Sequence, residues 1–193
     1  MARDPRPPTD FEHVLLGCMA REAYSGYGLK RIFSTTPAMA YQPSPGALYP
    51  ALRRLVSRGL LSAQDTVPPG GRPQRLYRAT EEGRAVHQEW LSQPVNPATI
   101  GNDLGLHLMR FAMMDDRADR AMARTFLADL ASALEAFVTG MESYLASGGN
   151  TAGLFGALAV EHGIAVHRAS LNWAKSALST LAAPTEPLSP CPH

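Results

Sequence analysis

A stretch typical of a helix leads directly into a stretch typical of a β-hairpin, and this order limits the possible folds more than any other feature. Residues 44–58, SPGALYPALRRLVSR, repeat apolar residues at helical spacing. Gly59 then predicts the end of that helix. The turn-rich sequence VPPGGRP (67–73) separates two short strand-like segments, 60–63 and 75–79. The sequence therefore predicts a helix followed at once by a two-stranded hairpin.

Three more helices surround this pair of elements. Thr9 and Glu12 have the spacing of a capping box, which predicts a helix over about 10–22. Ser25 is placed to cap a short second helix, and Thr80 is placed to cap a helix that begins EEGRAVHQEW. The order helix, helix, helix, hairpin, helix within about 90 residues is that of a winged helix-turn-helix. In that fold the third helix enters the major groove of DNA with its N-terminal end.

The second half of the chain is typical of packed helices. Pro94 and Pro97 mark the boundary, and apolar residues then recur at alternating spacings of four and three over 117–146 and 153–182. The short SGGN turn between them predicts an antiparallel helical pair. We expect this seam to join two copies of the chain, although it could instead form only a core within one chain. The residues assigned to dimerisation are Leu127, Leu130, Leu134, Phe137, Ile164, Leu171 and Leu178.

The expected fold class is therefore mainly α. It combines an N-terminal winged helix-turn-helix, with a two-stranded wing, and a C-terminal antiparallel helical dimerisation domain. The expected organisation is a disordered arm (1–9), a DNA-binding domain (10–93), a helical dimerisation and effector domain (94–183) and a disordered tail (184–193).

Charge is distributed unevenly between the two halves. Residues 1–93 hold 12 basic and 8 acidic side chains, a net charge of +4, whereas the remaining residues hold 6 and 9, a net charge of −3. A basic half joined to an acidic half indicates an anionic partner for the first half only. Most of the basic residues are arginine, which suits bidentate contacts with phosphate or guanine.

No pattern of a catalytic, metal or cofactor site is present in the sequence. The histidines do not pair with Cys, Asp or Glu at metal-ligand spacing, and there is no nucleophile elbow or phosphate-binding loop. We therefore expect no enzyme activity, no metal and no cofactor. No apolar run is long enough for a membrane span, and the first residues do not resemble a secretory signal. With only Cys18 and Cys191, a reduced cytoplasmic protein is expected.

The surface of the third helix and the wing carry the expected DNA contacts. On a helical wheel Gly46, Pro50 and Arg53 fall opposite the apolar face, and Pro50 is expected to leave the carbonyl of Gly46 without its helical partner. A surface helix with a kinked start and a solvated loop are the alternatives for helix and wing, and Tyr49 could simply pack at the helix edge. The residues assigned to DNA contact are Tyr27, Lys30, Ser44 (also the expected cap of this helix), Gly46, Ala47, Tyr49, Pro50, Arg53, Arg72 and Arg75.

Four blocks in order resemble the PadR family of bacterial transcription regulators. They are SGYGLKRIF (25–33), SPGALYPALRRLVSRGLL (44–61), GGRPQRLYRATEEGRA (70–85) and Trp90-Leu91. The resemblance implies a homodimer with paired winged helices, which represses or less often activates transcription and is often released by a small phenolic or hydrophobic effector. The sequence departs from the family pattern at Gly28, where a polar or acidic residue is common, and at Ala47, which is often threonine.

An effector site is expected in the second half of the chain, where apolar and polarisable side chains gather, although such residues are more often plain core. The candidates are Trp90, His107, Met109, Met113, His167 and Trp173. The sequence thus predicts a homodimeric, sequence-specific DNA-binding regulator on a pseudo-palindromic operator. A repressor released by a phenolic or hydrophobic effector is favoured over an effector-independent activator and over a winged-helix protein-interaction module.

Overall fold

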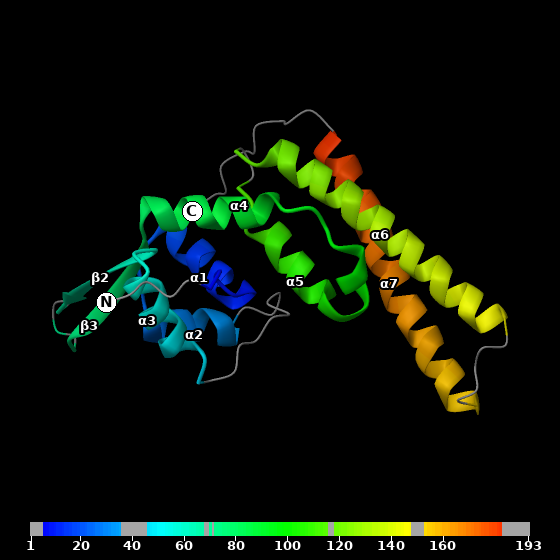
Figure 1. Cartoon of the computed structure of the whole chain (residues 1–193), viewed down its shortest axis with the longest axis horizontal. Coiled ribbons are helices and arrows are strands. Elements are labelled where there is room, and N and C mark those ends of the chain that lie inside the picture. Colours follow the sequence, from blue (N-terminus) through cyan, green and yellow to red (C-terminus); the bar gives the residue numbers. More distant parts are fainter. Residues whose placement is uncertain are drawn as a thin grey trace. The chain divides into compact units, whose positions relative to one another are not determined.

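The computed structural model describes residues 6–35, 46–67, 70, 72–115, 118–147 and 153–182. The chain divides into two compact units (Figure 1). The first unit contains the chain up to Gln93 together with Gly105–Met114, and the second contains Pro94–Leu104 and the chain from Asp115 onward. Each unit is described by itself below.

The first unit has the predicted order of helices and hairpin, with one additional short strand. Its elements are α1 (Asp10–Arg21), β1 (Tyr24–Ser25), α2 (Gly26–Thr35), α3 (Leu48–Ser57), β2 (Leu61–Thr66), β3 (Gln74–Ala79) and α4 (Glu81–Ser92). The strands form one antiparallel sheet in the order β1-β3-β2. Strand β1 was not predicted, because a strand of two residues is too short to show a period.

The predicted capping residues begin three of these helices. Thr9 and Glu12 form the complete capping box of α1: Thr9 N–H donates to Glu12 Oε2 at 2.9 Å, and Glu12 N–H donates to Thr9 Oγ1 at 3.3 Å. Ser25 Oγ accepts from Gly28 N–H at 3.1 Å, and Thr80 Oγ1 accepts from Gly83 N–H at 3.0 Å. These bonds satisfy amide groups that have no partner within their own helix.

The start of α3 differs from the prediction. The helix begins at Leu48 with Ala47 at the N-cap and no side-chain cap, so Ser44 is not its cap; Ser44 itself lies outside the described residues. Pro50 is consequently in the first helical turn. The first helical bond joins Ala51 N–H to the carbonyl of Ala47 at 3.1 Å. Because first-turn amides have no helical acceptor, Pro50 removes no helical hydrogen bond from α3.

The end of α3 sets the entry into the hairpin. Gly59 has a φ of 79°, a left-handed conformation that glycine adopts without steric cost. Its N–H donates to the carbonyl of Val56, and Leu60 N–H donates to the carbonyl of Leu55, each at 3.0 Å. This is a Schellman motif, which closes the helix and turns the chain into β2. Strands β2 and β3 then pair from Leu61 opposite Ala79 to Thr66 opposite Gln74.

Residues 105–114 belong to the first unit, whereas the predicted boundary assigned them to the C-terminal domain. The buried Arg110 gives the physical reason. Its guanidinium donates to the carbonyl of Leu91 at 3.2 Å and to that of Gln93, and it lies 5.6 Å from the centre of the Trp90 ring. A buried guanidinium must find acceptors, and the end of α4 provides them. Helix α5 (Ile100–Ala112) therefore contributes to both units.

The second unit is built around an antiparallel helical pair, α6 (Arg120–Ala146) and α7 (Gly153–Ala182). Their direction follows from the contacts: Arg120 Nη2, at the start of α6, donates to the carbonyl of Leu181 at 3.0 Å, and Lys175 Nζ donates to Glu135 Oε1 at 3.0 Å. The short 3-10 turn η1 (Pro97–Thr99) and the first residues of α5 complete this unit.

The predicted seam lies inside this pair. Leu127, Leu130 and Leu134 have no exposed surface in the single chain, and Ile164 and Leu171 on α7 are buried. Phe137 packs on the ring of His167, with ring centres 4.6 Å apart, and Leu178 is half-buried. Five of the seven residues are thus buried within one chain, which agrees with the alternative of an intrachain core, whereas Phe137 and Leu178 keep some exposed surface. A role of these residues in a subunit interface stays a prediction.

Parts of the predicted termini lie outside the described residues, namely residues 1–5 and the tail 184–193. Within the predicted arm, Thr9 is held by the capping box of α1. Among the described residues, no helix is long and apolar enough to cross a membrane.

Candidate nucleic-acid interface

Helix α3 has one buried and one exposed face, as the wheel predicted. Ala51, Leu52 and Leu55 have no exposed surface, whereas Arg53 and Ser57 are exposed. Of the smaller residues assigned to DNA contact, Gly46 is exposed and Ala47 and Pro50 are half-buried. The outward face of α3 therefore combines small residues at its start with one arginine a turn later. Such a face permits a close approach to a nucleic-acid groove and offers a guanidinium there.

Tyr49 lies across the start of α2. A Cβ added to Gly26 would be 2.6 Å from Cε1 and 3.3 Å from the hydroxyl oxygen of Tyr49, so Gly26 provides the space that the ring occupies. Tyr49 is nevertheless 49% exposed. The ring of Tyr49 therefore packs at the edge of the helix, and about half of the side-chain surface remains available for contact with a partner. This close approach of α2 and α3 was not visible in the sequence.

The remaining predicted contacts lie on α2 and the wing. Tyr27 is 75% exposed, and Lys30 is exposed on the same helix. Arg72 is exposed at the wing. Arg75 faces Asp65 across the hairpin, with 3.9 Å between Arg75 Nε and Asp65 Oδ1, and both side chains are more than half exposed. Exposed pairs at this distance are weak, so Arg75 can still turn toward an anion.

Trp90, proposed as an effector-site wall, is part of the core of the first unit. Its Nε1–H donates to Asp10 Oδ1 at 3.1 Å, and its ring stacks on His13 with centres 5.1 Å apart and 3° between the planes. With Arg110 on the same ring, the indole already has both polar and aromatic partners. His107 and Met109 are buried in this unit and Met113 is half-buried. These four candidates therefore match the alternative of plain core.

Burial also controls the ionisation of this core. Burial, with a smaller contribution from the nearby His87, lowers the pKa of His13 to about 4, so the imidazole is neutral at pH 7. Among the described residues, Nδ1 of His13 has no hydrogen-bond partner. Burial raises the pKa of the Cys18 thiol to about 11, which keeps it protonated and unreactive.

The other two effector candidates belong to the second unit. Nδ1 of His167 lies 2.7 Å from the carbonyl oxygen of Gly163, and Nε2 lies 3.3 Å from that of Ile100. His167 is thus an interior histidine whose two ring nitrogens both face backbone carbonyl oxygens, which matches the alternative of plain core. Trp173 is 38% exposed on α7. In the part of the chain that the structure describes, no three His, Cys, Asp or Glu side chains gather in a way that could hold a metal ion.

Comparison with known proteins agrees with this geometry. Residues 15–89 match a family model described as "Transcriptional regulator PadR-like family". They include α2, α3, the hairpin and most of α4. Transcriptional regulator Rv3488 of Mycobacterium tuberculosis is 51% identical over 49 residues, 25% of this chain and 45% of that protein. The negative transcriptional regulator PadR of Bacillus subtilis is 23% identical over 97 residues, 49% of this chain and 53% of that protein. The match thus spans about half the length of these relatives.

Solved structures give a similar result at lower similarity. The structure of Bacillus subtilis PadR in complex with operator DNA has a TM-score of 0.44 and 19% identity, and the alignment covers 90% of this chain and 99% of that one. The PadR-like regulator BC1756 from Bacillus cereus has a TM-score of 0.37 and 24% identity, with 89% and 97% covered. Because both TM-scores are below 0.5, the assignment depends on the sequence match and the winged-helix order. Residues 15–89 therefore form a domain similar to that of the PadR-like family of transcriptional regulators.

Proposed function

We propose that this protein binds an operator in double-stranded DNA and regulates transcription from it. One observation carries the proposal: the exposed side of α3, with Arg53, lies in a PadR-like winged helix and is accompanied by the exposed Tyr27 and Lys30 on α2. Arginine on a helix in the major groove reads guanine with two hydrogen bonds, whereas lysine and tyrosine on flanking elements hold the backbone. Arg72 and Arg75 at the wing add cations that suit the phosphate backbone or a narrow minor groove.

Binding as a homodimer belongs to the same proposal. One recognition helix reads few base pairs, and two copies reach half-sites about one DNA turn apart. Because most of the seam is buried within one chain, we place the contact between the copies on another surface. Helix α7 carries exposed apolar side chains on the side opposite its seam, here called the α7 stripe: Leu154, Phe155, Leu158, Val166 and Trp173. An exposed apolar row of this length is typical of a protein interface.

We further propose that the protein acts as a cytoplasmic repressor that a small phenolic or hydrophobic molecule releases. One relative is a negative regulator by name, and Bacillus subtilis PadR has been solved with p-coumaric acid. Of the six effector candidates, Trp173 on α7 has the most exposed side chain, so we favour it for contact with an effector. An effector-independent activator is the alternative on the same DNA-binding surface.

The test is fluorescence anisotropy with labelled DNA from upstream of the protein's own gene and an unrelated fragment of equal length. We expect tighter binding to the upstream fragment and an affinity that falls steeply between 50 and 200 mM salt, because phosphate contacts release counterions. Addition of p-coumaric acid should then release the upstream fragment. Salt-insensitive or absent binding to both fragments would support the protein-interaction module instead.

A further inference from the structure

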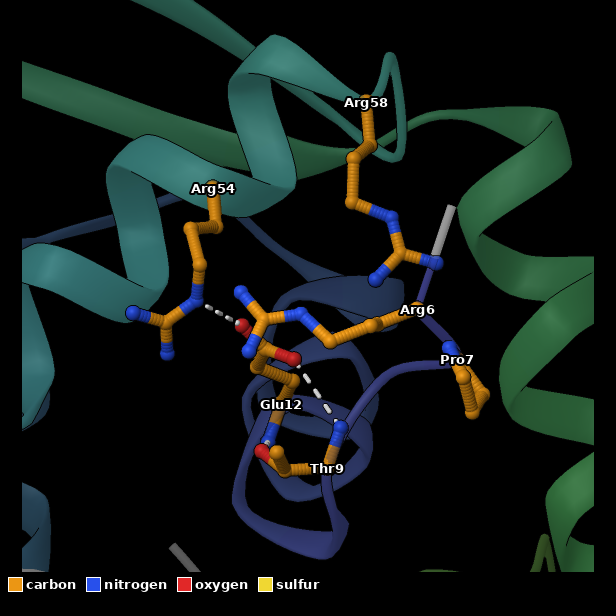
Figure 2. A pocket seen from close by; sticks show the side chains of 6 residues that line it. All are labelled: Arg6, Pro7, Thr9, Glu12, Arg54 and Arg58. Atoms are coloured by element: carbon orange, nitrogen blue, oxygen red, sulfur yellow. Dashed lines mark hydrogen bonds and ion pairs between the residues drawn. The ribbon is translucent and has the colours of Figure 1, made fainter. Parts of the chain in front are cut away.

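A cavity of about 300 Å³ lies between the start of α1 and the end of α3 (Figure 2). Six residues line it: Arg6, Pro7, Thr9, Glu12, Arg54 and Arg58. None of them was assigned to a site from the sequence. Arg6, Pro7, Thr9 and Glu12 precede the residues that match the family.

Glu12 fixes one wall of the cavity. Its side chain is 2% exposed, and each carboxylate oxygen has a partner: Oε2 accepts from Thr9 N–H at 2.9 Å, and Oε1 accepts from Arg54 Nε at 2.8 Å. The Arg54 side chain is 42% exposed. Since the bond to Glu12 uses the Nε–H of Arg54, the two terminal nitrogens of its guanidinium remain for another acceptor. A buried carboxylate in this position therefore acts as an orienting group for Arg54.

The charge of the lining residues is unbalanced. Three guanidinium groups face one carboxylate, a net charge of +2. Figure 2 shows Arg6 extending toward Glu12, with Arg54 on one side of it and Arg58 on the other. Among the described residues, the Arg58 guanidinium forms no hydrogen bond or ion pair. Like charges brought together in a cavity repel, and the repulsion is removed when an anion occupies the space between them.

We propose that this cavity binds a phosphate group, with Arg54 and Arg58 as its principal donors and Arg6 closing the third side. Guanidinium groups present paired N–H donors that match phosphate oxygens, and three of them, two from the end of α3 and one from the segment before α1, surround a tetrahedral anion better than a planar carboxylate. Glu12 is a positioning residue in this site, because it acts through Arg54 and not on the anion.

The place of the cavity on α3 indicates where such a phosphate would come from. At about 100° per residue, Arg54 and Arg58 are turned away from Arg53 by about 100° and 140°. They therefore flank the outward face of α3 instead of sharing it. A helix in the major groove has the phosphate backbone along its sides, and contacts there set the register of the protein on DNA. A DNA backbone as the source of the phosphate rests on the proposed DNA-binding function, whereas free phosphate could fill the same site without DNA.

The first experiment measures DNA binding by the full chain as a function of salt. Arg58→Gln is the test variant, because it removes the charge but keeps a polar side chain. Arg124→Gln, at an exposed position on α6, is the matched control for loss of one positive charge. If the cavity holds a backbone phosphate, Arg58→Gln should reduce the slope of log K against log salt by about 0.9 and weaken binding several-fold at 100 mM salt. The control should keep the wild-type slope.

The second experiment uses inorganic phosphate without DNA, compared with chloride at equal ionic strength. Arginine Nε–H NMR signals of Arg54 and Arg58 should shift saturably with phosphate in the wild type and in Arg124→Gln. In Arg58→Gln the affinity read from the Arg54 signal should fall at least tenfold. Circular dichroism establishes that each variant is folded.

Together the two experiments distinguish a DNA phosphate from a free phosphate ligand. They also distinguish failure of the phosphate site from failure of the proposed DNA-binding function. A slope change specific to Arg58→Gln supports a DNA phosphate, and a phosphate response without that slope change supports the site with a free phosphate ligand. If the wild type binds DNA but neither readout separates Arg58→Gln from Arg124→Gln, the cavity is not a phosphate site. If the wild type does not bind DNA with salt sensitivity, the proposed function fails, and the inorganic phosphate titration alone decides about the cavity.

Discussion

Helices α3 and α7 both bury one face and expose the other, but their exposed faces differ in chemistry. The outward side of α3 carries Arg53 and Ser57 beside small residues, whereas α7 exposes the stripe of Leu154, Phe155, Leu158, Val166 and Trp173. A polar, cationic face keeps its water until an anionic partner replaces it. An apolar face gains free energy when any complementary apolar surface covers it. The two exposed faces therefore suit different kinds of partner, an anionic one for α3 and an apolar one for α7.

The interiors of the two units differ in a parallel way. Among its described residues, the first unit buries five ionisable side chains: Glu12, His13, His87, His107 and Arg110. In the second unit, the buried polar side chains among the described residues are Asp119 and His167, within a seam of leucine and alanine. Buried ionisable groups make stability depend on pH, whereas an apolar seam does not. Five predictions test these contrasts, from the largest expected effect to the smallest.

The largest effect is expected from the α7 stripe. Leu158→Glu combined with Val166→Glu places charges on the surface proposed to join two copies, so the protein should become monomeric. Binding to a two-half-site operator should fall by roughly 10²–10⁴-fold, because the second half-site is no longer linked to the first. Light scattering after gel filtration measures mass, and anisotropy measures affinity. Asn172→Glu, exposed on the same helix outside the stripe, is the control; equal behaviour of test and control would exclude the stripe.

Arg53→Ala should have the next largest effect. Loss of a bidentate contact with a base costs about 1–3 kcal/mol, or roughly 5–150-fold in affinity, and specificity between operator and unrelated DNA should decrease with it. Arg124→Ala removes an equal charge from an exposed position on α6 and should leave specificity unchanged. Anisotropy on both fragments gives the ratio. A wild-type ratio in Arg53→Ala would show that α3 does not read bases through this residue.

His13 should make the first unit acid-sensitive. Its pKa is about 4 in the folded protein and about 6.5 when unfolded, so between these values the unfolded state binds more protons. Stability that is present above pH 6.5 should therefore decrease by ~1–3 kcal/mol as the pH falls to 4. His13→Phe keeps a ring on Trp90 and should flatten this dependence. Urea unfolding from pH 7.5 to 4 measures it, and an unchanged pH profile in the variant would assign the effect to groups other than His13.

Gly26→Ala should act through Tyr49. The added methyl group would lie 2.6 Å from the Tyr49 ring, so the ring must move while the fold is retained. We expect a three- to tenfold loss of operator affinity, corresponding to about 1 kcal/mol. Gly28→Ala is the matched control, because its nearest neighbour, Ser25 Oγ, is 3.4 Å away. If both variants bind DNA equally, the position of Tyr49 has no influence on binding.

The smallest effect is expected for Pro50→Ala. Since Pro50 lies in the first turn of α3 and removes no helical bond, the free energy of unfolding should change by about 0.5 kcal/mol or less. Chemical denaturation measures this value. A loss of more than 2 kcal/mol would show that the proline ring contributes packing that the helix start alone does not explain.

Much of the fold could be predicted from the sequence because its signals are local. Thr9 with Glu12, Ser25, Gly59 and Thr80 each act on groups within four residues, and the structure confirms the elements that they begin or end. The start of α3 was the exception. A serine and a proline in SPGALYP suggested a helix from Ser44, but the helical bonds begin only at Ala47.

The sequence by itself determined the order of elements, the basic character of the first half and the resemblance of four blocks to one family. Only the tertiary structure decided that most of the predicted seam between α6 and α7 is buried within one chain. It also decided that Arg110 places residues 105–114 in the first unit and that Tyr49 fills the space beside Gly26. It also brought Glu12 to Arg54, 42 positions apart. The physical reason is the range of the interactions: capping and periodicity act along the chain, whereas burial and charge pairing depend on neighbours that only folding brings together.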